Sequence, residues 1–336
     1  MEPSPEQPSS APPSAPPPSA PRSSVARSSV ASSPGQPSAP PRHDQPPLDA
    51  HAIAAASREV VRRALQEDLG NHGDVTSIAT VHADAIGAAD LVARADGVIA
   101  GTALVGLVYE QLDPRVEVTW QVGEGDVIAS GQHLGRVAGP LRSVLTGERT
   151  ALNFLTHLSG VATRTYAYAR AVDGTGCVVR DTRKTTPGMR LLEKAAVRAG
   201  GGVSHRIGLF DALLVKDNHV AAAGSVANAT RRAIARSGGR PVQIEVDSLE
   251  QLDEAIEAGA RDVLLDNFDV EQTRAAVDRV RELEGRHGRI LLESSGRITL
   301  DNVADYADAG VDRIAVGALT HSAPQLDIGL DFHLDA

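Results

Sequence analysis

Short apolar runs alternate with amphipathic stretches through the second half of the chain. The stretches at 249–258 and 270–284 repeat apolar residues with the period of a helix. Runs that are apolar throughout are typical of strands buried on both faces of a parallel sheet. Several such strands separated by helices favour an α/β barrel over a small open sheet, although the pattern does not say whether the barrel closes. The predicted strands are residues 177–180, 212–215, 242–246, 262–265, 290–292 and 313–316.

The first half of the chain follows a different pattern. Apolar residues at helical spacing predict a helix over 57–69, with Ser57 as its N-cap and Gly70 at its end. Residues 88–137 contain short strand-like runs separated by glycine turns, with one helix among them. This mixture predicts a layered α+β domain ahead of the barrel.

A long helical stretch follows at residues 141–172. Leu145, Leu152 and Leu155 recur on one face of it, as in a helix that packs against a core. Gly160 interrupts the stretch, and glycine weakens a helix interior. We therefore expect a break in the helix at Gly160.

Residues 1–47 form a low-complexity tail that holds fifteen of the twenty prolines. The tail has too little apolar mass to offset its ordering entropy, so it is predicted to be disordered. Its arginines and serines are typical of an organelle transit peptide, but its prolines would break the amphipathic helix that such a peptide needs. The chain contains no apolar block of a secretory signal and no membrane-spanning run, and Cys177 is its single cysteine. These features predict a soluble, cytoplasmic protein without an internal disulfide.

Positive charge is concentrated in one short segment, residues 177–219. Eight Arg and Lys residues stand there against four acids, a local balance of +4 in a chain of net charge −10. An acidic protein with such a segment is better suited to a small, densely charged anion than to nucleic acid or membrane. A solvated face of salt-bridged side chains would also give this composition.

Charged residues and glycines fall where the predicted strands end. In a barrel of parallel strands, the carboxyl ends of the strands meet at one rim, which is where catalysis takes place. A surface network of salt bridges has no reason to fall repeatedly on strand ends, so the placement favours a functional site. The residues at these ends are Asp181, Arg183, Lys184, Lys216, Glu245, Asp266, Glu293, Ser294, Ser295, Gly296, Gly317 and Ala318.

Two of these residues, Glu245 and Asp266, end adjacent predicted strands. Together they form a pair of hard oxygen donors suited to Mg²⁺, held directly or through water, and Mg²⁺ usually accompanies a phosphorylated substrate. The alternative is that the two carboxylates form structural ion pairs with Lys184 and Lys216. Lys216 could instead be a Schiff-base lysine, although the neighbouring Asp217 opposes the lowered pKa that this role needs.

The remaining rim residues are suited to anions. The glycine turns after the last two strands can hold a phosphate through backbone N–H groups. Arg183 and Arg206, with His205 beside them, offer planar donors that select carboxylates.

Seven segments, in order, resemble one enzyme family. They are EDLGNHGDVTS, GERTALNFLTHLSGVAT, DTRKTTPGMRLLEKAAVRAGGGVSHRIGLFDALLVKDNH, IEVDSLEQLDEA, VLLDNF, LLESSGRI and IAVGALTHSAPQLDIGLDF. Together they resemble nicotinate-nucleotide pyrophosphorylase (carboxylating), also called quinolinate phosphoribosyltransferase, over residues 54–332. The resemblance implies an open, TIM-like α/β barrel over 158–320. It also implies an N-terminal α+β sandwich over 48–157, rejoined by 321–336.

The resemblance also implies a reaction and an assembly. The family converts quinolinate and phosphoribosyl pyrophosphate to nicotinate mononucleotide, CO₂ and pyrophosphate with Mg²⁺, in NAD biosynthesis. It forms homodimers with shared active sites. Three alternatives stay open: a phosphoribosyltransferase that acts on nicotinate, a catalytically silent phosphosugar-binding protein, and a Schiff-base aldolase.

The family motifs imply roles for individual residues. Lys184, Glu245 and Asp266 are expected to act in catalysis, with the two carboxylates near the ribose and the metal. Arg149 corresponds to an arginine supplied by the neighbouring subunit. Arg297 departs from the family, which more often has a small residue there. The expected substrate-binding set is Arg149, Thr182, Arg183, Lys184, His205, Arg206, Lys216, Glu245, Asp266, Ser295, Gly296, Arg297, Val316, Gly317 and Ala318.

Overall fold

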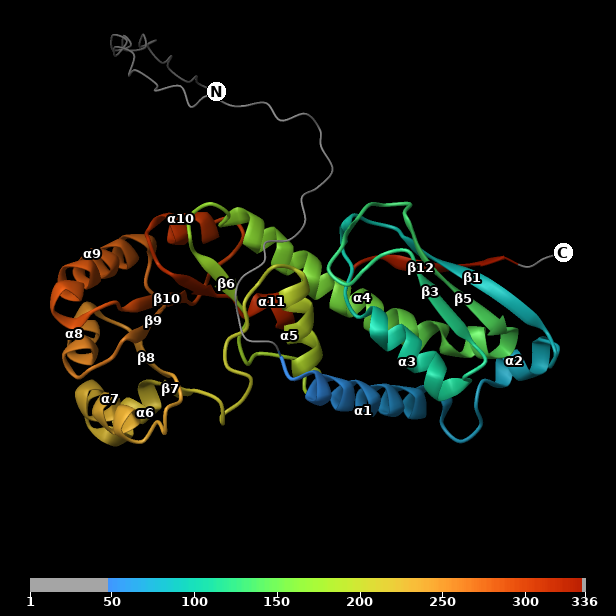
Figure 1. Cartoon of the computed structure of the whole chain (residues 1–336), viewed down its shortest axis with the longest axis horizontal. Helices are drawn as coiled ribbons and strands as arrows, with labels where there is room; N and C mark the ends of the chain where they lie inside the picture. The colour runs from blue at the N-terminus through green and yellow to red at the C-terminus, as the bar shows by residue number, and fades with distance from the viewer. Residues whose placement is uncertain (1–47, 334–336) are drawn as a thin grey trace, which may run out of the picture. The chain divides into compact units, whose positions relative to one another are not determined.

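The computed structural model describes residues 48–333 (Figure 1). The predicted disordered tail, residues 1–47, lies outside the described residues, as do residues 334–336. No helix within the described part of the chain combines the length and the apolar character needed to cross a bilayer.

The first helix, α1 (Ala50–Leu69), begins earlier than predicted. Its N-cap is Asp49, whose carboxylate accepts the N–H groups of His51 at 2.9 Å and Ala52 at 3.1 Å. Ser57 lies inside the helix, where its hydroxyl donates to the Ile53 carbonyl oxygen at 2.8 Å, so the prediction of Ser57 as the cap was wrong. The helix ends at Gly70, as predicted, with a positive φ of 51° that suits glycine.

An antiparallel sheet forms the first layer of the N-terminal part, in the order β12-β1-β5-β3. Strand β12 comes from the far end of the chain and pairs with β1 from Ala88 opposite His333 to Ala93 opposite Ile328. Helices α3 and α4 lie beneath the sheet (Figure 1). The elements are β1 (Ile86–Ala93), β3 (Glu117–Trp120), β5 (His133–Pro140), β12 (Ile328–His333), the separate pair β2 (Gly97–Val98) and β4 (Val127–Ile128), and helices α2 (Val75–Thr80), α3 (Thr102–Leu112) and α4 (Leu141–Ala171).

Helix α4 runs unbroken for 31 residues, so the predicted break at Gly160 was wrong. A Cβ at Gly160 would lie 3.0 Å from the Pro324 carbonyl carbon and closer still to its oxygen. Glycine is therefore needed at this position so that the segment before β12 can pass close to α4. The hydrogen bonds of the helix hold the backbone of Gly160 in its helical conformation. Helix α4 crosses the expected domain boundary at 157/158, so no change of element marks that boundary. The division into domains stays a prediction.

Six parallel strands form the second sheet, in the order β6-β11-β10-β9-β8-β7. Within residues 48–333, the end strands β6 and β7 do not pair with each other, and the β6 edge carries an isolated bridge from Arg180 to Val203. The sheet is thus the open α/β barrel that was expected, and its six strands match the six predicted from apolar runs. The strands are β6 (Val178–Arg180), β7 (Leu213–Val215), β8 (Val242–Val246), β9 (Asp262–Asp266), β10 (Leu291–Ser295) and β11 (Arg313–Ala315).

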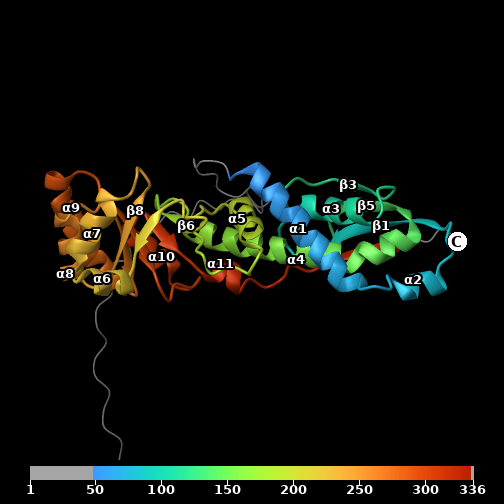
Figure 2. The ribbon, with the colours of Figure 1, turned by 90° about the horizontal axis from the view of Figure 1, so that it is seen from below.

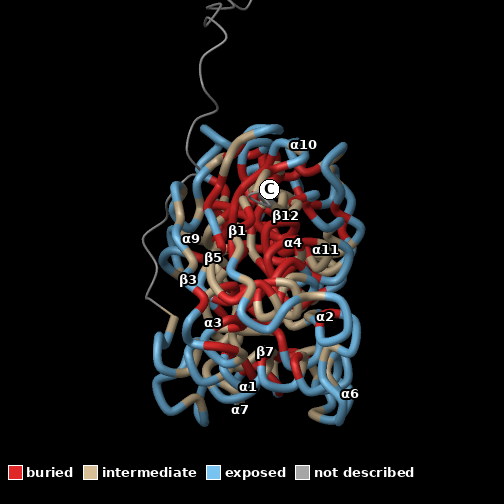
Figure 3. Tube along the Cα trace, turned by 90° about the vertical axis from the view of Figure 1, so that its right-hand side faces the viewer, coloured by how far each residue is buried: buried red, intermediate tan, exposed pale blue. Residues whose placement is uncertain are grey.

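Helices cover the outside of this sheet, with α8, α9 and α10 along strands β8 to β10 (Figure 1). Helix α1 packs against α3, α4 and α5, so it connects the two sheet regions, as the view from below shows (Figure 2). Buried residues gather along α4 and strands β1 and β5, and exposed residues lie on the surrounding loops (Figure 3). The remaining helices are α5 (Arg190–Ala199), α6 (Asp217–Ala223), α7 (Val226–Ala235), α8 (Leu249–Glu257), α9 (Val270–His287), α10 (Val303–Asp308) and α11 (Ala318–His321).

Candidate active site

A cavity of about 740 Å³ opens at the carboxyl ends of the barrel strands. Its walls come from the loops after β6, from β7 and from the ends of β8, β9 and β10, which is the rim that the sequence indicated. The cavity brings together most of the predicted site. The predicted residues that line it are Thr182, Arg183, Lys184, His205, Arg206, Lys216, Glu245, Asp266 and Ser295.

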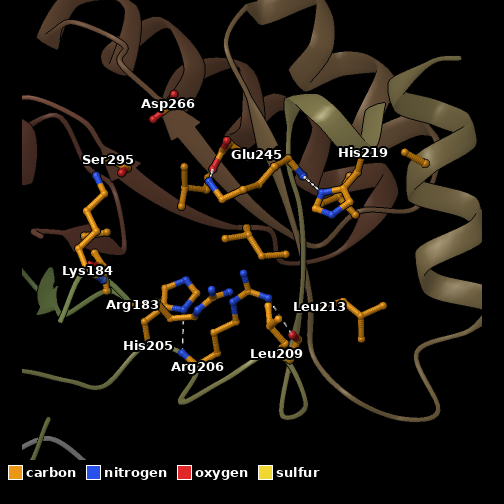
Figure 4. Close-up of a pocket in the computed structure, with 18 of the residues that line it drawn as sticks. Arg183, Lys184, His205, Arg206, Leu209, Leu213, His219, Glu245, Asp266 and Ser295 are labelled. Carbon is orange, nitrogen blue, oxygen red and sulfur yellow. Dashed lines mark hydrogen bonds and ion pairs between the residues drawn. The ribbon is translucent and has the colours of Figure 1, made fainter. Parts of the chain in front are cut away.

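Two guanidinium groups converge in this cavity. Arg183 and Arg206 point into the same space from different loops (Figure 4). The guanidinium of Arg183 has no acceptor within residues 48–333, and its Nε is buried without a partner. In the same described range, the Arg206 guanidinium has one acceptor, the Ala212 carbonyl oxygen at 3.3 Å. Burial, and next the positive charge of Arg183, lower the pKa of Arg206. Two half-buried cations that face each other without a carboxylate between them form a site for an anion.

Lys184, next to Arg183 in the chain, lies at the edge of the cavity and extends towards Ser295 (Figure 4). Its ammonium has no ion-pair partner among the described residues, whereas its carbonyl oxygen accepts the Thr320 hydroxyl at 2.7 Å. The stem of Lys184 passes close to Gly317, where a Cβ would lie 3.1 Å from the lysine Cδ. Gly317 therefore leaves room for the lysine to reach the cavity.

The turns after β9 and β10 are locked to each other. Asn267, with a positive φ of 59°, donates its backbone N–H to the Ser295 carbonyl oxygen at 2.8 Å. A Cβ at Gly296 would lie 2.9 Å from Asn267 Cγ, so the close approach requires glycine. Arg297, the departure from the family, also has a positive φ, 55°, and its side chain is exposed.

Several predicted residues do not line the cavity. Gly296 and Arg297 lie in the turn after Ser295, Val316 is buried, and Gly317 and Ala318 stand where β11 leads into α11. Arg149 is exposed on α4 and makes no hydrogen bond or ion pair within residues 48–333. The assignment of Arg149 to a partner's site stays a prediction.

The two carboxylates on the wall are in different situations. Glu245 forms an ion pair with Lys216, which is the structural pairing that the sequence left open for one of them. Asp266 has no ion pair within residues 48–333 and accepts the Asn267 amide at 2.8 Å. No group of three or more His, Cys, Asp or Glu side chains in the described part of the chain is arranged to hold a metal ion. Two carboxylates would suit an Mg²⁺ ion whose other ligands are water and substrate phosphates, and the assignment of Glu245 and Asp266 to a metal stays a prediction.

Comparison with known families matches almost all of the described chain. The family described as quinolinate phosphoribosyl transferase, N-terminal domain, matches residues 74–159, and its C-terminal domain matches residues 161–331. The chain belongs to the quinolinate phosphoribosyltransferase family.

Relatives of the quinolinate phosphoribosyltransferase family resemble this chain along most of their length. A nicotinate-nucleotide pyrophosphorylase (carboxylating) of Mycobacterium leprae is 50% identical over 278 residues, which cover 82% of this chain and 97% of that protein. A chloroplastic relative of the same name from Oryza sativa is 38% identical over 313 residues, 88% of this chain and 80% of that protein. The solved structure of the nicotinate-nucleotide pyrophosphorylase from Francisella tularensis is similar with a TM-score of 0.78 at 37% identity, and the match covers 83% of this chain and 96% of that one.

Two polar residues that line the cavity of this quinolinate phosphoribosyltransferase family member were not predicted from the sequence. His219 lines the cavity, and its Nδ1 accepts the backbone N–H of Lys216 at 2.9 Å. The spacing of three residues at the start of α6 is the signal that could have identified it. Arg232 reaches the cavity from α7, and nothing in its local sequence distinguishes it from other helix-surface arginines.

Two carboxylates that were placed on the rim instead turn inwards. Asp181 is fully buried and forms an ion pair with the equally buried Lys194. Its carboxylate also accepts the His205 backbone N–H at 2.8 Å. Glu293 is fully buried too, and it accepts Arg180 at 2.6 Å inside the barrel. Alternate side chains of a strand point to opposite faces, so a residue near a strand end can belong to the barrel interior.

Another buried carboxylate, Glu193 on α5, supports the loop that carries Arg183 and Lys184. It accepts the backbone N–H of Thr186 at 3.1 Å and lies 2.9 Å from His157 Nε2 on α4. Helix α5 therefore holds two loops of the cavity. Glu193 holds the loop of Thr186, and Lys194 holds the loop of His205.

Proposed function

We propose that this protein is a quinolinate phosphoribosyltransferase, which converts quinolinate and phosphoribosyl pyrophosphate to nicotinate mononucleotide, CO₂ and pyrophosphate in NAD biosynthesis. The observation that carries the proposal is the convergence of Arg183 and Arg206, unneutralised, in the cavity of a chain that belongs to this family. Quinolinate has two adjacent carboxylates, and two planar cations are suited to bind them in pairs of parallel hydrogen bonds.

The cavity offers separate cations to the two anionic substrates. Arg183 and Arg206 point into the cavity, where they would bind the pyridine dicarboxylate, and Lys184 extends towards Ser295, where it would bind the phosphorylated sugar. A phosphoribosyltransferase that acts on nicotinate would have a single carboxylate to bind. Two guanidinium groups that have no carboxylate partner within residues 48–333 favour the dicarboxylate.

Ribosyl transfer then needs stabilisation of positive charge on the sugar. The pyridine nitrogen forms a bond to C1 of the ribose, and the bond from C1 to the pyrophosphate oxygen breaks, with its electron pair leaving on pyrophosphate. Glu245 and Asp266 lie on the wall where the carboxylates would stabilise the oxocarbenium character of C1. Mg²⁺, when bound by these two residues and the substrate phosphates, would supply charge neutralisation for the leaving group.

Loss of CO₂ follows from the chemistry of the product. The bond between C2 of the ring and its carboxylate breaks, the electron pair stays at C2 beside the positive ring nitrogen, and a proton replaces CO₂ there. Arg183 and Arg206 hold the ring and keep water from its carboxylates, which is the contribution the chain has to make.

The proposal also includes a homodimer and a cytoplasmic location. A homodimer would let the exposed Arg149 of one subunit enter the cavity of the other, where it would add a third cation for quinolinate. A cytoplasmic location agrees with a single, buried Cys177, whose pKa burial raises to about 12.

Incubation of the purified chain with quinolinate, phosphoribosyl pyrophosphate and Mg²⁺ tests the proposal. We expect nicotinate mononucleotide and CO₂ in equal amounts, and no product when Mg²⁺ is removed by a chelator. Turnover of nicotinate without CO₂ would identify the rival phosphoribosyltransferase. Ligand binding without any product would identify a silent phosphosugar-binding protein, and trapping of Lys216 by borohydride would identify an aldolase.

A further inference from the structure

Every polar group of His205 is engaged. Its backbone N–H donates to Asp181 at 2.8 Å, and its carbonyl oxygen accepts Lys194 Nζ at 3.1 Å. Its ring Nδ1 lies 2.7 Å from the backbone nitrogen of Arg206, and its Nε2 lies 2.9 Å from Gln243 Oε1. Both hydrogen bonds of the ring are directed to the protein, and Glu293 Oε1 lies 4.0 Å from Nε2, so neither ring nitrogen is left for a substrate, in contrast with the direct contact that the family resemblance implies.

These contacts fix which ring nitrogen carries the proton. The backbone N–H of Arg206 is a donor, so Nδ1 of His205 must be the unprotonated acceptor. A neutral ring then carries its hydrogen on Nε2, which can donate to the Gln243 oxygen. Burial lowers the pKa of His205 to about 4, in agreement with a neutral ring at physiological pH.

The orientation of Gln243 is fixed in turn by buried carboxylates. Its amide nitrogen donates to Glu293 at 2.7 Å and to Asp262 at 2.9 Å. Because an ionised carboxylate only accepts hydrogen bonds, the amide nitrogen must face the two acids and the amide oxygen must face His205. Arg180 and Arg313 contact Glu293, so its charge is balanced inside the barrel. Gln243 is almost fully buried, on β8 below the cavity.

We propose that Gln243 is a positioning residue for quinolinate binding. It holds His205 as the Nε2–H tautomer, and Nδ1 of that tautomer fixes the Arg206 backbone so that the guanidinium meets Arg183 in the cavity. The proposal rests on the proposed function, which assigns the two arginines to quinolinate. It gives His205 an indirect role, through Arg206, and extends the site to a barrel-interior residue that touches no ligand.

The first test is Gln243→Met, which preserves the side-chain length and removes the amide. The Michaelis constant for quinolinate should rise roughly tenfold, the change expected from losing the hydrogen bond to His205, while that for phosphoribosyl pyrophosphate stays within about twofold. The control is Thr273→Val on α9, a fully buried residue whose hydroxyl donates to the backbone carbonyl oxygen of Asp269 at 2.7 Å. It should perturb folding to a similar degree and leave both constants unchanged.

A second pair of variants separates the two ring nitrogens. In His205→Asn the amide oxygen takes the place of Nδ1 and can still accept from Arg206, whereas in His205→Gln the amide reaches the place of Nε2. We expect His205→Asn to bind quinolinate more tightly than His205→Gln. The reverse order would overturn the proposal.

Nitrogen NMR of protein labelled in its histidine rings reads the tautomer directly, with the His205 signals assigned by their absence in His205→Asn. The wild-type ring should be protonated on Nε2 alone, and Gln243→Met should shift it towards a mixture. An unchanged tautomer in Gln243→Met, or an equal rise in both Michaelis constants, would overturn the proposal. Failure of the wild-type chain to use quinolinate would refute the function itself, and the NMR experiment would still report on the ring.

Discussion

The buried ion pair of Lys194 and Asp181 gives the sharpest stability prediction. In Lys194→Met the Asp181 carboxylate stays fully buried and keeps one recorded hydrogen bond, from the His205 N–H at 2.8 Å, while its Oδ2 has no partner. Removal of one partner from a buried pair costs about 3–5 kcal/mol, because the other charge is left uncompensated. We expect this loss in the free energy of unfolding, measured by urea denaturation at pH 8.

The same variant should respond to pH in a defined direction. Burial raises the pKa of Asp181, and loss of the Lys194 charge removes the largest opposing effect. When the pKa of a carboxyl is higher in the folded than in the unfolded state, the protonated carboxyl stabilises the fold. This contribution is fully present below the unfolded-state pKa, about 3.9, and is lost as the pH rises through the folded-state pKa. The deficit of Lys194→Met should therefore be smaller at pH 5 than at pH 8.

The double variant Asp181→Asn, Lys194→Met is the matched control. It removes both charges, and the asparagine oxygen can still accept the His205 N–H, so most of the lost stability should return. A deficit below about 1 kcal/mol in Lys194→Met, equal deficits at pH 5 and pH 8, or a double variant no more stable than the single one would refute the reasoning.

Three further predictions concern activity and packing. Arg206→Lys keeps the charge but loses the planar fork, so the Michaelis constant for quinolinate should rise about 10- to 100-fold in steady-state assays, as charge-assisted hydrogen bonds predict. Arg149→Ala and Lys184→Ala should each be inactive alone and recover activity when mixed; no recovery would argue against a shared site. Gly160→Ala should lower the thermal midpoint because its Cβ would collide with the Pro324 carbonyl, whereas Gly285→Ala, in open space on α9, should leave it unchanged or raise it slightly.

The sequence alone determined the order of elements and the edge of the sheet that carries the site. Apolar runs are a local property, so the six barrel strands were predicted close to their observed positions. Lys216, Glu245 and Asp266 follow or end those strands, and parallel strands bring such residues to one rim whatever the details of packing. The family motifs depend on the same local order.

Only the tertiary structure decided which charges are free and which are paired. Asp181 and Glu293 resemble rim residues in the sequence, yet their partners come from α5 and β6, so their burial depends on packing between distant segments. Gly160 likewise lies among residues that form a helix. The need for glycine there comes from contact with Pro324, more than 160 residues away in the chain. Arg183 has no carboxylate partner within residues 48–333 for the same reason: pairing depends on three-dimensional neighbours, which no local pattern records.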